Sequence, residues 1–175
     1  MKINNKDKNI VLIGFMGSGK TSVGKRLSLV LKREFIDTDD FIEKREGMTI
    51  NEIFKEKGEE EFRKIERELY KRFSTPKKKI IATGGGVIKN SANIANLKKG
   101  GVIVYLKSSP EKIAQNLKFD NTRPILQVDD KEAKIRELLA QREAFYNKYA
   151  EITIDVSNYD IDHTVDKIIE LAKVW

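Results

Sequence analysis

Cysteine is absent from this chain of 175 residues, and His163 is its only histidine. The lack of cysteine excludes disulfides, thiolate nucleophiles and metal sites built on cysteine, and it is compatible with a reducing compartment. A metal site with several histidine ligands is excluded as well. We expect His163 near the start of a helix and assign it no functional role.

Long apolar runs are also missing. The apolar run in the N-terminal stretch MKINNKDKNIVLIGFMG is far shorter than the ~20 residues of a membrane-spanning helix, and no small-residue cleavage pattern follows it. The sequence therefore predicts a cytoplasmic protein with no membrane partner. Its length suits a single domain over residues 1–175, and a domain of this size buries roughly 70% of the surface of its unfolded chain.

No charge of one sign is massed in one block. Lysine and arginine number 34 against 27 aspartate and glutamate residues, and the resulting net charge of +7 would suit either nucleic acid or a small anionic substrate. Because the charges are interleaved and no repeat of basic and aromatic residues occurs, the pattern favours small anions and predicts no nucleic-acid partner.

The sequence does contain an alternation of apolar runs with helical patterns. The apolar runs predict strands at 10–13, 35–37, 80–83, 102–106 and 152–156. TINE, at 49–52, fits a capping box for a short helix, with Thr49 as N-cap and Glu52 reaching back. Apolar residues at helical spacing predict further helices around 62–73, 135–149 and 165–172. This order favours a parallel sheet covered by helices on both faces.

A glycine-rich loop lies between the first strand and the first helix. Its residues Gly14, Gly19, Lys20 and Thr21 match G-x-x-x-x-G-K-[ST], in the strand-to-helix context that this pattern requires. Backbone N–H groups would hold phosphate oxygens, Lys20 would neutralise the β and γ phosphates, and the Thr21 hydroxyl would bind Mg²⁺. A glycine-rich turn with an incidental lysine is the less favoured alternative.

Two aspartates close the second strand, where open α/β sheets place their ligands. Asp37 could bind Mg²⁺ or its waters, and Asp39 could orient an acceptor hydroxyl. Capping of the helix that follows, by Asp39 and Asp40, is an equally favoured alternative. A second glycine-rich stretch, at 84–86, follows the third strand and would allow the backbone to approach a ligand closely.

Three arginines are candidates for anion binding, although most arginines on helices are simply solvated. Arg142 continues the apolar stripe of its helix, so its charge either reaches water or faces an anion in a cavity. Arg63 lies at the edge of an apolar face, and the pair would suit a carboxylate. Arg123 lies in the polar segment 118–130, which contains Pro124 and is long enough to form a mobile lid over a transferring phosphoryl group.

Taken jointly, GFMGSGKT, DTD, EEFRKIE, TGGGV, TRPIL and QREAFY resemble shikimate kinase in order and spacing, across essentially the whole chain. The resemblance implies a three-layer P-loop NTPase fold of the nucleoside-monophosphate-kinase type, with a five-stranded parallel sheet flanked by helices. It also implies a phosphate loop at 14–21, a substrate-binding helical region at about 39–74 and a mobile lid at about 117–130.

The same resemblance implies a role for each candidate residue. The catalytic residues would be Lys20, Asp39 and Arg123. ATP would be bound by the phosphate loop and the lid, through Gly17, Ser18, Gly19, Lys20, Thr21, Ser22 and Arg123. Shikimate would be bound by Asp39, Arg63, Gly84, Gly85, Gly86 and Arg142, with the two arginines on its carboxylate. The metal ligands would be Thr21 and Asp37.

The implied activity is Mg²⁺-dependent phosphorylation of the 3-hydroxyl of shikimate by ATP, in the chorismate pathway of aromatic amino-acid biosynthesis, by a monomer. A related kinase acting on gluconate is the nearest alternative, and a nucleotide switch or nucleic-acid-binding ATPase is a remote one, since the guanine motif N-K-x-D is absent. Two departures from the family occur. Asn116, Lys118 and Asp120 occupy the region where many members carry an arginine near the adenine, so residues 157–162 are the candidate adenine wall. Thr83 replaces a frequent serine.

Overall fold

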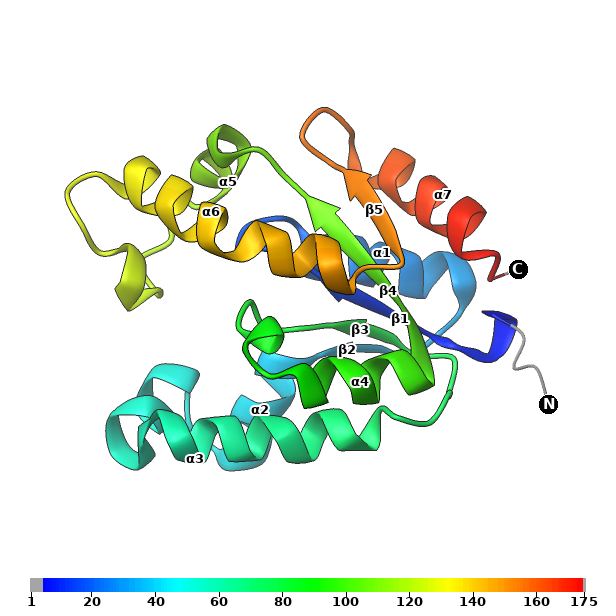
Figure 1. The fold of residues 1–175 in the computed structure, drawn as a ribbon, viewed down its shortest axis with the longest axis horizontal. Coiled ribbons are helices and arrows are strands. Elements are labelled where there is room, and N and C mark those ends of the chain that lie inside the picture. Colours follow the sequence, from blue (N-terminus) through cyan, green and yellow to red (C-terminus); the bar gives the residue numbers. More distant parts are fainter. Residues whose placement is uncertain (1–4, 175) are drawn as a thin grey trace.

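The computed structural model describes residues 5–174 and has the five-stranded parallel sheet that the sequence predicts (Figure 1). The strands are β1 (Asn9–Ile13), β2 (Phe35–Asp37), β3 (Ile80–Ala82), β4 (Gly101–Lys107) and β5 (Ile152–Asp155). Their order across the sheet is β2-β3-β1-β4-β5, and every neighbouring pair is parallel. Each predicted strand is therefore confirmed, with ends that differ by at most one residue.

Helices connect the strands and cover both faces of the sheet. They are α1 (Lys20–Leu31), α2 (Thr38–Glu46), α3 (Ile50–Arg72), α4 (Ser91–Gly100), α5 (Pro110–Asn116), α6 (Lys131–Tyr149) and α7 (Ile161–Ala172). Three short 3₁₀ helices are η1 (Asn5–Asp7), η2 (Val87–Lys89) and η3 (Pro124–Leu126). Among the described residues, no helix combines the length and the apolar character that a membrane crossing requires.

The alternation of side chains along β1 divides the core into two layers. Ile10 and Leu12 pack with α1 and α7 on one face, whereas Val11 and Ile13 join the larger cluster under α3, α4, α5 and α6 on the other. This period of two places apolar residues on both faces, as a parallel strand buried between helices requires. The result is three layers, helix, sheet and helix, with the sheet in the middle.

The helical region between β2 and β3 contains one bent helix, α3. The sequence pattern predicts two separate helices over the same residues. At the start of α3 the predicted capping box is present, because the Thr49 hydroxyl accepts from the Glu52 N–H (3.1 Å) and the Glu52 carboxylate accepts from the Thr49 N–H (2.7 Å). Gly58 then interrupts the helix with φ 84° and ψ 165°, a conformation that glycine adopts without strain. Figure 1 shows the start of α3 on the same side of the view as the segment between α5 and α6.

Candidate functional site

The carboxyl ends of the strands border one large cavity, of about 980 Å³. Its walls come from the loop after β1, the end of β2, the loop after β3, the segment between α5 and α6, and the turn after β5. Lys20, Thr21, Asp37, Asp39 and Arg123 all line it. Ligand crevices of open parallel sheets lie at this edge, so the structure brings the predicted donor and metal residues into one place.

The phosphate loop has the backbone that anion binding requires. Gly17 and Gly19 adopt left-handed conformations, with φ of 77° and 92°. Gly19 is the N-cap of α1, and no side chain caps this end of the helix. The first N–H groups of α1 therefore remain available to phosphate oxygens. The buried hydroxyl of Ser18 lines the same cavity and has no hydrogen-bond partner within the described chain, which fits a phosphate ligand.

Lys20 lies folded against the loop that it follows. Its ammonium donates to the carbonyl oxygens of Gly14 (2.6 Å) and Phe15 (3.0 Å). Burial lowers the pKa of Lys20 to about 8, and the nearby positive charge of Arg123 acts in the same direction. An anion at this position would reverse the effect of both, because it would stabilise the protonated ammonium.

Thr21 and Asp37 meet across the start of α1 and the end of β2. The Thr21 hydroxyl donates to Oδ2 of Asp37 at 2.8 Å. The other carboxylate oxygen, Oδ1, accepts from the N–H groups of Asp39 and Asp40, so Asp37 is the N-cap of α2. The alternative that Asp39 and Asp40 cap this helix is therefore wrong, since both lie in its first turn.

The hydroxyl and carboxylate of this pair suit Mg²⁺, which prefers oxygen ligands. Among residues 5–174 there is no cluster of three or more His, Asp or Glu side chains arranged for a metal ion. Mg²⁺ in phosphoryl-transfer sites typically takes one or two protein oxygens and completes its shell with phosphates and water. The donor set of Thr21 and Asp37 fits this mode of binding.

Asp39 faces the glycine-rich loop that follows β3. Burial raises the pKa of its carboxyl to about 6, with the negative charges of Asp37 and Glu66 adding to the shift, while Lys20 and Arg123 oppose it. Since Asp37 takes over the capping of α2, the Asp39 side chain is left for the cavity that it lines.

Three consecutive glycines face the three side chains that were predicted to bind the acceptor. A Cβ atom on Gly84 would lie 2.8 Å from Oδ1 of Asp39, one on Gly85 would lie 3.6 Å from Nη1 of Arg142, and one on Gly86 would lie 2.9 Å from Nη1 and Nη2 of Arg63. None of the three has a positive φ. Space rather than backbone strain therefore calls for glycine at positions 84 and 86, whereas a Cβ at position 85 would make an ordinary contact.

Hydroxyl groups of neighbouring helices hold the glycine-rich loop in place. The N–H of Gly84 donates to the buried hydroxyl of Thr38 at 3.1 Å, and that hydroxyl lies 3.2 Å from the Tyr70 hydroxyl. The Tyr146 hydroxyl donates to the carbonyl oxygen of Gly85 at 3.2 Å. These supporting residues were not singled out from the sequence, because a buried hydroxyl on a helix carries no motif.

The two helical arginines are both partly buried beside these glycines. Arg63 pairs with Glu66 at 3.0 Å, and its guanidinium lies 5.1 Å from the centre of the Phe62 ring. The guanidinium of Arg142 lies 5.5 Å from the centre of the Phe15 ring. Aromatic faces hold guanidinium groups in one orientation while leaving their N–H groups free for a ligand.

Residues of α5 and of the turn after β5 line the part of the cavity beyond the phosphate loop. Asn116 donates from Nδ2 to the carbonyl oxygen of Gly17 at 2.8 Å, and Tyr159 packs on His163 with ring centres 4.3 Å apart. His163 lies in the first turn of α7, as predicted. Ser108, which the sequence analysis did not identify, also lines the cavity with a buried hydroxyl that has no partner among the described residues. Its position directly after β4 is the signal that could have identified it.

Comparisons with known proteins agree with this site. The family model described as shikimate kinase matches residues 16–173. The shikimate kinase of Caldanaerobacter subterraneus subsp. tengcongensis is 50% identical over 162 residues, covering 93% of this chain and 94% of that protein. The structure of shikimate kinase from Acinetobacter baumannii in complex with shikimate superposes with a TM-score of 0.88 at 40% identity, covering 94% of this chain and 92% of that one.

A gluconokinase from Sinorhizobium meliloti shares the fold alone, with a TM-score of 0.54 and 15% identity over 97% of this chain and 96% of that one. The matches to shikimate kinases span nearly the full length of both partners at much higher identity. The chain belongs to the shikimate kinase family.

Proposed function

We propose that this chain transfers the γ-phosphoryl group of ATP to the 3-hydroxyl of shikimate through the residues that line its cavity, giving ADP and shikimate 3-phosphate. One observation carries the assignment of residues. Gly84, Gly85 and Gly86 each face a different charged side chain, one acidic and two basic. A Cβ atom added to each glycine would lie 2.8 to 3.6 Å from the nearest atom of that side chain. A small acceptor with hydroxyls and a carboxylate matches that arrangement.

The donor half of the site is the phosphate loop with Arg123. The free N–H groups at the start of α1 would bind the phosphates of ATP, and Lys20 would neutralise their β and γ oxygens. Ser18, Gly19, Gly17 and Ser22 belong to the same wall of the cavity. Arg123, from the segment between α5 and α6, would offset the charge on the transferring group.

Thr21 and Asp37 would hold Mg²⁺ between this loop and β2. The ion supplies charge neutralisation for the β and γ phosphates when bound. The Thr21 hydroxyl donates to the Asp37 carboxylate at 2.8 Å, so both oxygens face one another.

The acceptor half is formed by the glycine-rich loop with Asp39, Arg63 and Arg142. The two guanidinium groups would bind the carboxylate of shikimate with bidentate geometry, and the backbone of residues 84–86 would approach the ring where a side chain would intrude. Asp39 would accept a hydrogen bond from the 3-hydroxyl. In a loose transition state such a carboxylate orients the nucleophile more than it removes the proton early.

We divide the single domain into three functional segments: a phosphate loop at 14–21, an acceptor-binding helical region at about 39–74, and a lid at about 117–130. The position of Arg63 on α3 and of Arg123 between α5 and α6 supports this division. A monomer, a cytoplasmic location and the lack of a nucleic-acid partner stay predictions from the sequence.

ADP release from MgATP tests the proposed function directly. Shikimate should stimulate release strongly and saturably, whereas gluconate and a nucleoside monophosphate should leave it near the rate without acceptor. Omitting Mg²⁺ should abolish the shikimate-dependent rate. Stimulation by gluconate instead would mean that the arginine pair binds another small acid. The phosphate-loop fold would then be supported, but the assignment of shikimate as the acceptor would be wrong.

A further inference from the structure

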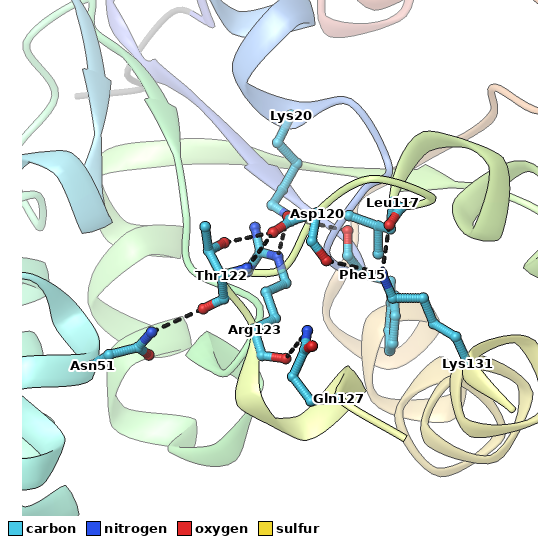
Figure 2. A network of polar contacts seen from close by, with 9 residues as sticks. All are labelled: Phe15, Lys20, Asn51, Leu117, Asp120, Thr122, Arg123, Gln127 and Lys131. Carbon is cyan, nitrogen blue, oxygen red and sulfur yellow. Dashed lines mark hydrogen bonds and ion pairs between the residues drawn. The ribbon is translucent and has the colours of Figure 1, made fainter. Parts of the chain in front are cut away.

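A hydrogen bond joins the lid to the helical region that binds the acceptor. Nδ2 of Asn51 donates to the carbonyl oxygen of Thr122 at 2.9 Å (Figure 2). Asn51 lies in the first turn of α3, and Thr122 directly precedes Arg123. The two residues lie 71 positions apart in the chain, so this bond connects segments that could otherwise move separately.

The lid residues around Thr122 form one compact unit. Oδ1 of Asp120 accepts from the N–H (2.8 Å) and the hydroxyl (2.6 Å) of Thr122, and Oδ2 accepts from Nε of Arg123 at 3.3 Å (Figure 2). These bonds lower the pKa of Asp120, so the carboxylate stays ionised at neutral pH. Since Thr122 directly precedes Arg123, the position of the Thr122 carbonyl constrains the backbone from which the Arg123 side chain extends.

The other end of this unit is fixed to α6. Nζ of Lys131 donates to the carbonyl oxygens of Leu117 (2.6 Å) and Asp120 (2.8 Å). The unit is thus suspended between α6, through Lys131, and α3, through Asn51 (Figure 2).

We propose that Asn51 is a positioning residue, which holds the Arg123 guanidinium at the phosphate end of the cavity by tying the lid to α3. This inference rests on the proposed function, because it takes Arg123 to act on the phosphates of ATP. The Arg123 side chain is 41% exposed, so its pair with Asp120 competes with water and does not fix it alone.

The same bond couples the two substrates. Arg63, on α3, lies beside Gly86 in the acceptor half of the site, while Arg123 lies in the donor half. A shikimate carboxylate held by Arg63 restrains the part of α3 that follows Gly58. The bend at Gly58 joins this part to the first turns of α3, where Asn51 holds the lid. Binding of one substrate then favours binding of the other, and by linkage the effect is equal in both directions. A single hydrogen bond of this kind corresponds to roughly a two- to tenfold effect.

Asn51→Asp isolates this role from folding. The aspartate has the same shape but presents an oxygen to the Thr122 carbonyl, so the bond is lost and replaced by repulsion. A negative charge in the first turn of a helix is favourable, so the stability of α3 should not fall. Lys55→Gln, at an exposed position one turn later on α3, changes the net charge by the same amount and serves as the matched control.

Isothermal titration of shikimate, with and without MgADP, measures the coupling. In the wild-type protein MgADP should tighten shikimate binding, and Asn51→Asp should reduce that enhancement roughly two- to tenfold while leaving binding without nucleotide unchanged. kcat/KM for MgATP should fall by a similar factor, and Lys55→Gln should match the wild type. Wild-type coupling in Asn51→Asp, or no coupling in the wild type, would overturn the proposal.

A double-mutant cycle with Arg123→Ala shows whether Asn51 acts through the lid arginine. If it does, Asn51→Asp should have little further effect on kcat/KM for MgATP once Arg123 has been removed. Additive losses would overturn the positioning role. An effect of Arg123→Ala with none of Asn51→Asp would reject only this inference, whereas unchanged turnover in Arg123→Ala would reject the role of Arg123 in the proposed function.

Discussion

The backbone of Gly84 and the carboxylate of Asp39 leave no room for a methyl group between them, since a Cβ on Gly84 would lie 2.8 Å from Oδ1 of Asp39. Gly84 cannot retreat without breaking the bond from its N–H to the buried Thr38 hydroxyl. A side chain at position 84 must therefore displace Asp39. The glycine of a loop thus fixes the position of an acid in the first turn of α2.

We expect Gly84→Ala to lower kcat on the order of 10²-fold, because a displacement of about 1 Å in a reacting group can cost that much. Steady-state kinetics at saturating MgATP and shikimate measures the effect. Gly85→Ala is the control, because its Cβ would lie at an ordinary contact distance of 3.6 Å from Arg142. This variant should raise KM for shikimate with a smaller change in kcat. Wild-type kcat in Gly84→Ala would remove Asp39 from the reacting centre.

Arg142 offers a simpler test of carboxylate binding than Arg63 does. Its guanidinium packs over Phe15. Arg142→Ala should weaken shikimate binding by about 1.5–3 kcal/mol, because the bound carboxylate loses a charged partner, and should leave thermal stability nearly unchanged. Isothermal titration with shikimate measures this change in binding free energy. Unchanged affinity would mean that Arg142 serves only to pack against Phe15.

Arg63 is expected to differ from Arg142, because it also pairs with a buried acid. Glu66 is 2% exposed and lies 3.0 Å from the Arg63 guanidinium, while burial raises the pKa of its carboxyl. Arg63→Ala should therefore lower the free energy of unfolding by about 1–3 kcal/mol in addition to weakening shikimate binding. Adding Glu66→Gln should restore part of the stability but none of the affinity. Recovery of both in the double variant would limit Arg63 to a structural role.

Motifs with a local physical cause were predictable from the sequence. The strands follow from β-branched apolar runs, and the capping box of Thr49 and Glu52 needs only neighbouring residues. The phosphate loop is recognisable for the same reason, since the left-handed glycines and the start of α1 are contiguous. These features depend on residues that lie within a few positions of one another.

Features that depend on distant segments were not predictable in the same way. Asp37, Asp39 and Asp40 all suit an N-cap. Asp37 takes this position because α2 begins at Thr38, which places the N–H groups of Asp39 and Asp40 within reach of the Asp37 carboxylate. The bond from Asn51 to the lid joins residues 71 positions apart, and asparagine in a first turn carries no signal of it. Packing of the whole chain decides such contacts.

Lys20 and Arg123 should each contribute strongly to turnover. Both cations line the phosphate end of the cavity, and Arg123 is close enough for its charge to lower the pKa of Lys20. Lys20→Ala and Arg123→Ala should each reduce kcat by a factor on the order of 10² to 10³, the size seen when one stabilising donor is removed from a reacting centre. Unchanged turnover in both variants, measured by ADP release, would contradict these roles.

The opposite pKa shifts of Asp39 and Lys20 predict a bell-shaped pH profile. Burial raises the pKa of Asp39 to about 6 and lowers that of Lys20 to about 8, so ionised Asp39 and protonated Lys20 predominate together between these values. kcat/KM should therefore rise through about pH 6 and fall above about pH 8, since it reports the free enzyme. The alkaline limb of kcat should lie higher, because bound phosphates stabilise protonated Lys20.

The free energy of unfolding should also depend on the ionisation of Asp39. Its folded pKa of about 6 exceeds the usual 3.8, so the folded state binds the proton more tightly, and the resulting stabilisation is lost as the pH rises from about 4 through about 6. Asn cannot ionise, so Asp39→Asn should be more stable than the wild type by about 1–3 kcal/mol at pH 8, with a difference that shrinks toward pH 4. Urea unfolding at both pH values measures this difference. A variant less stable than the wild type at pH 8 would mean that the ionised carboxylate is stabilised by its neighbours, and the acidic limb of the activity profile would then need another group.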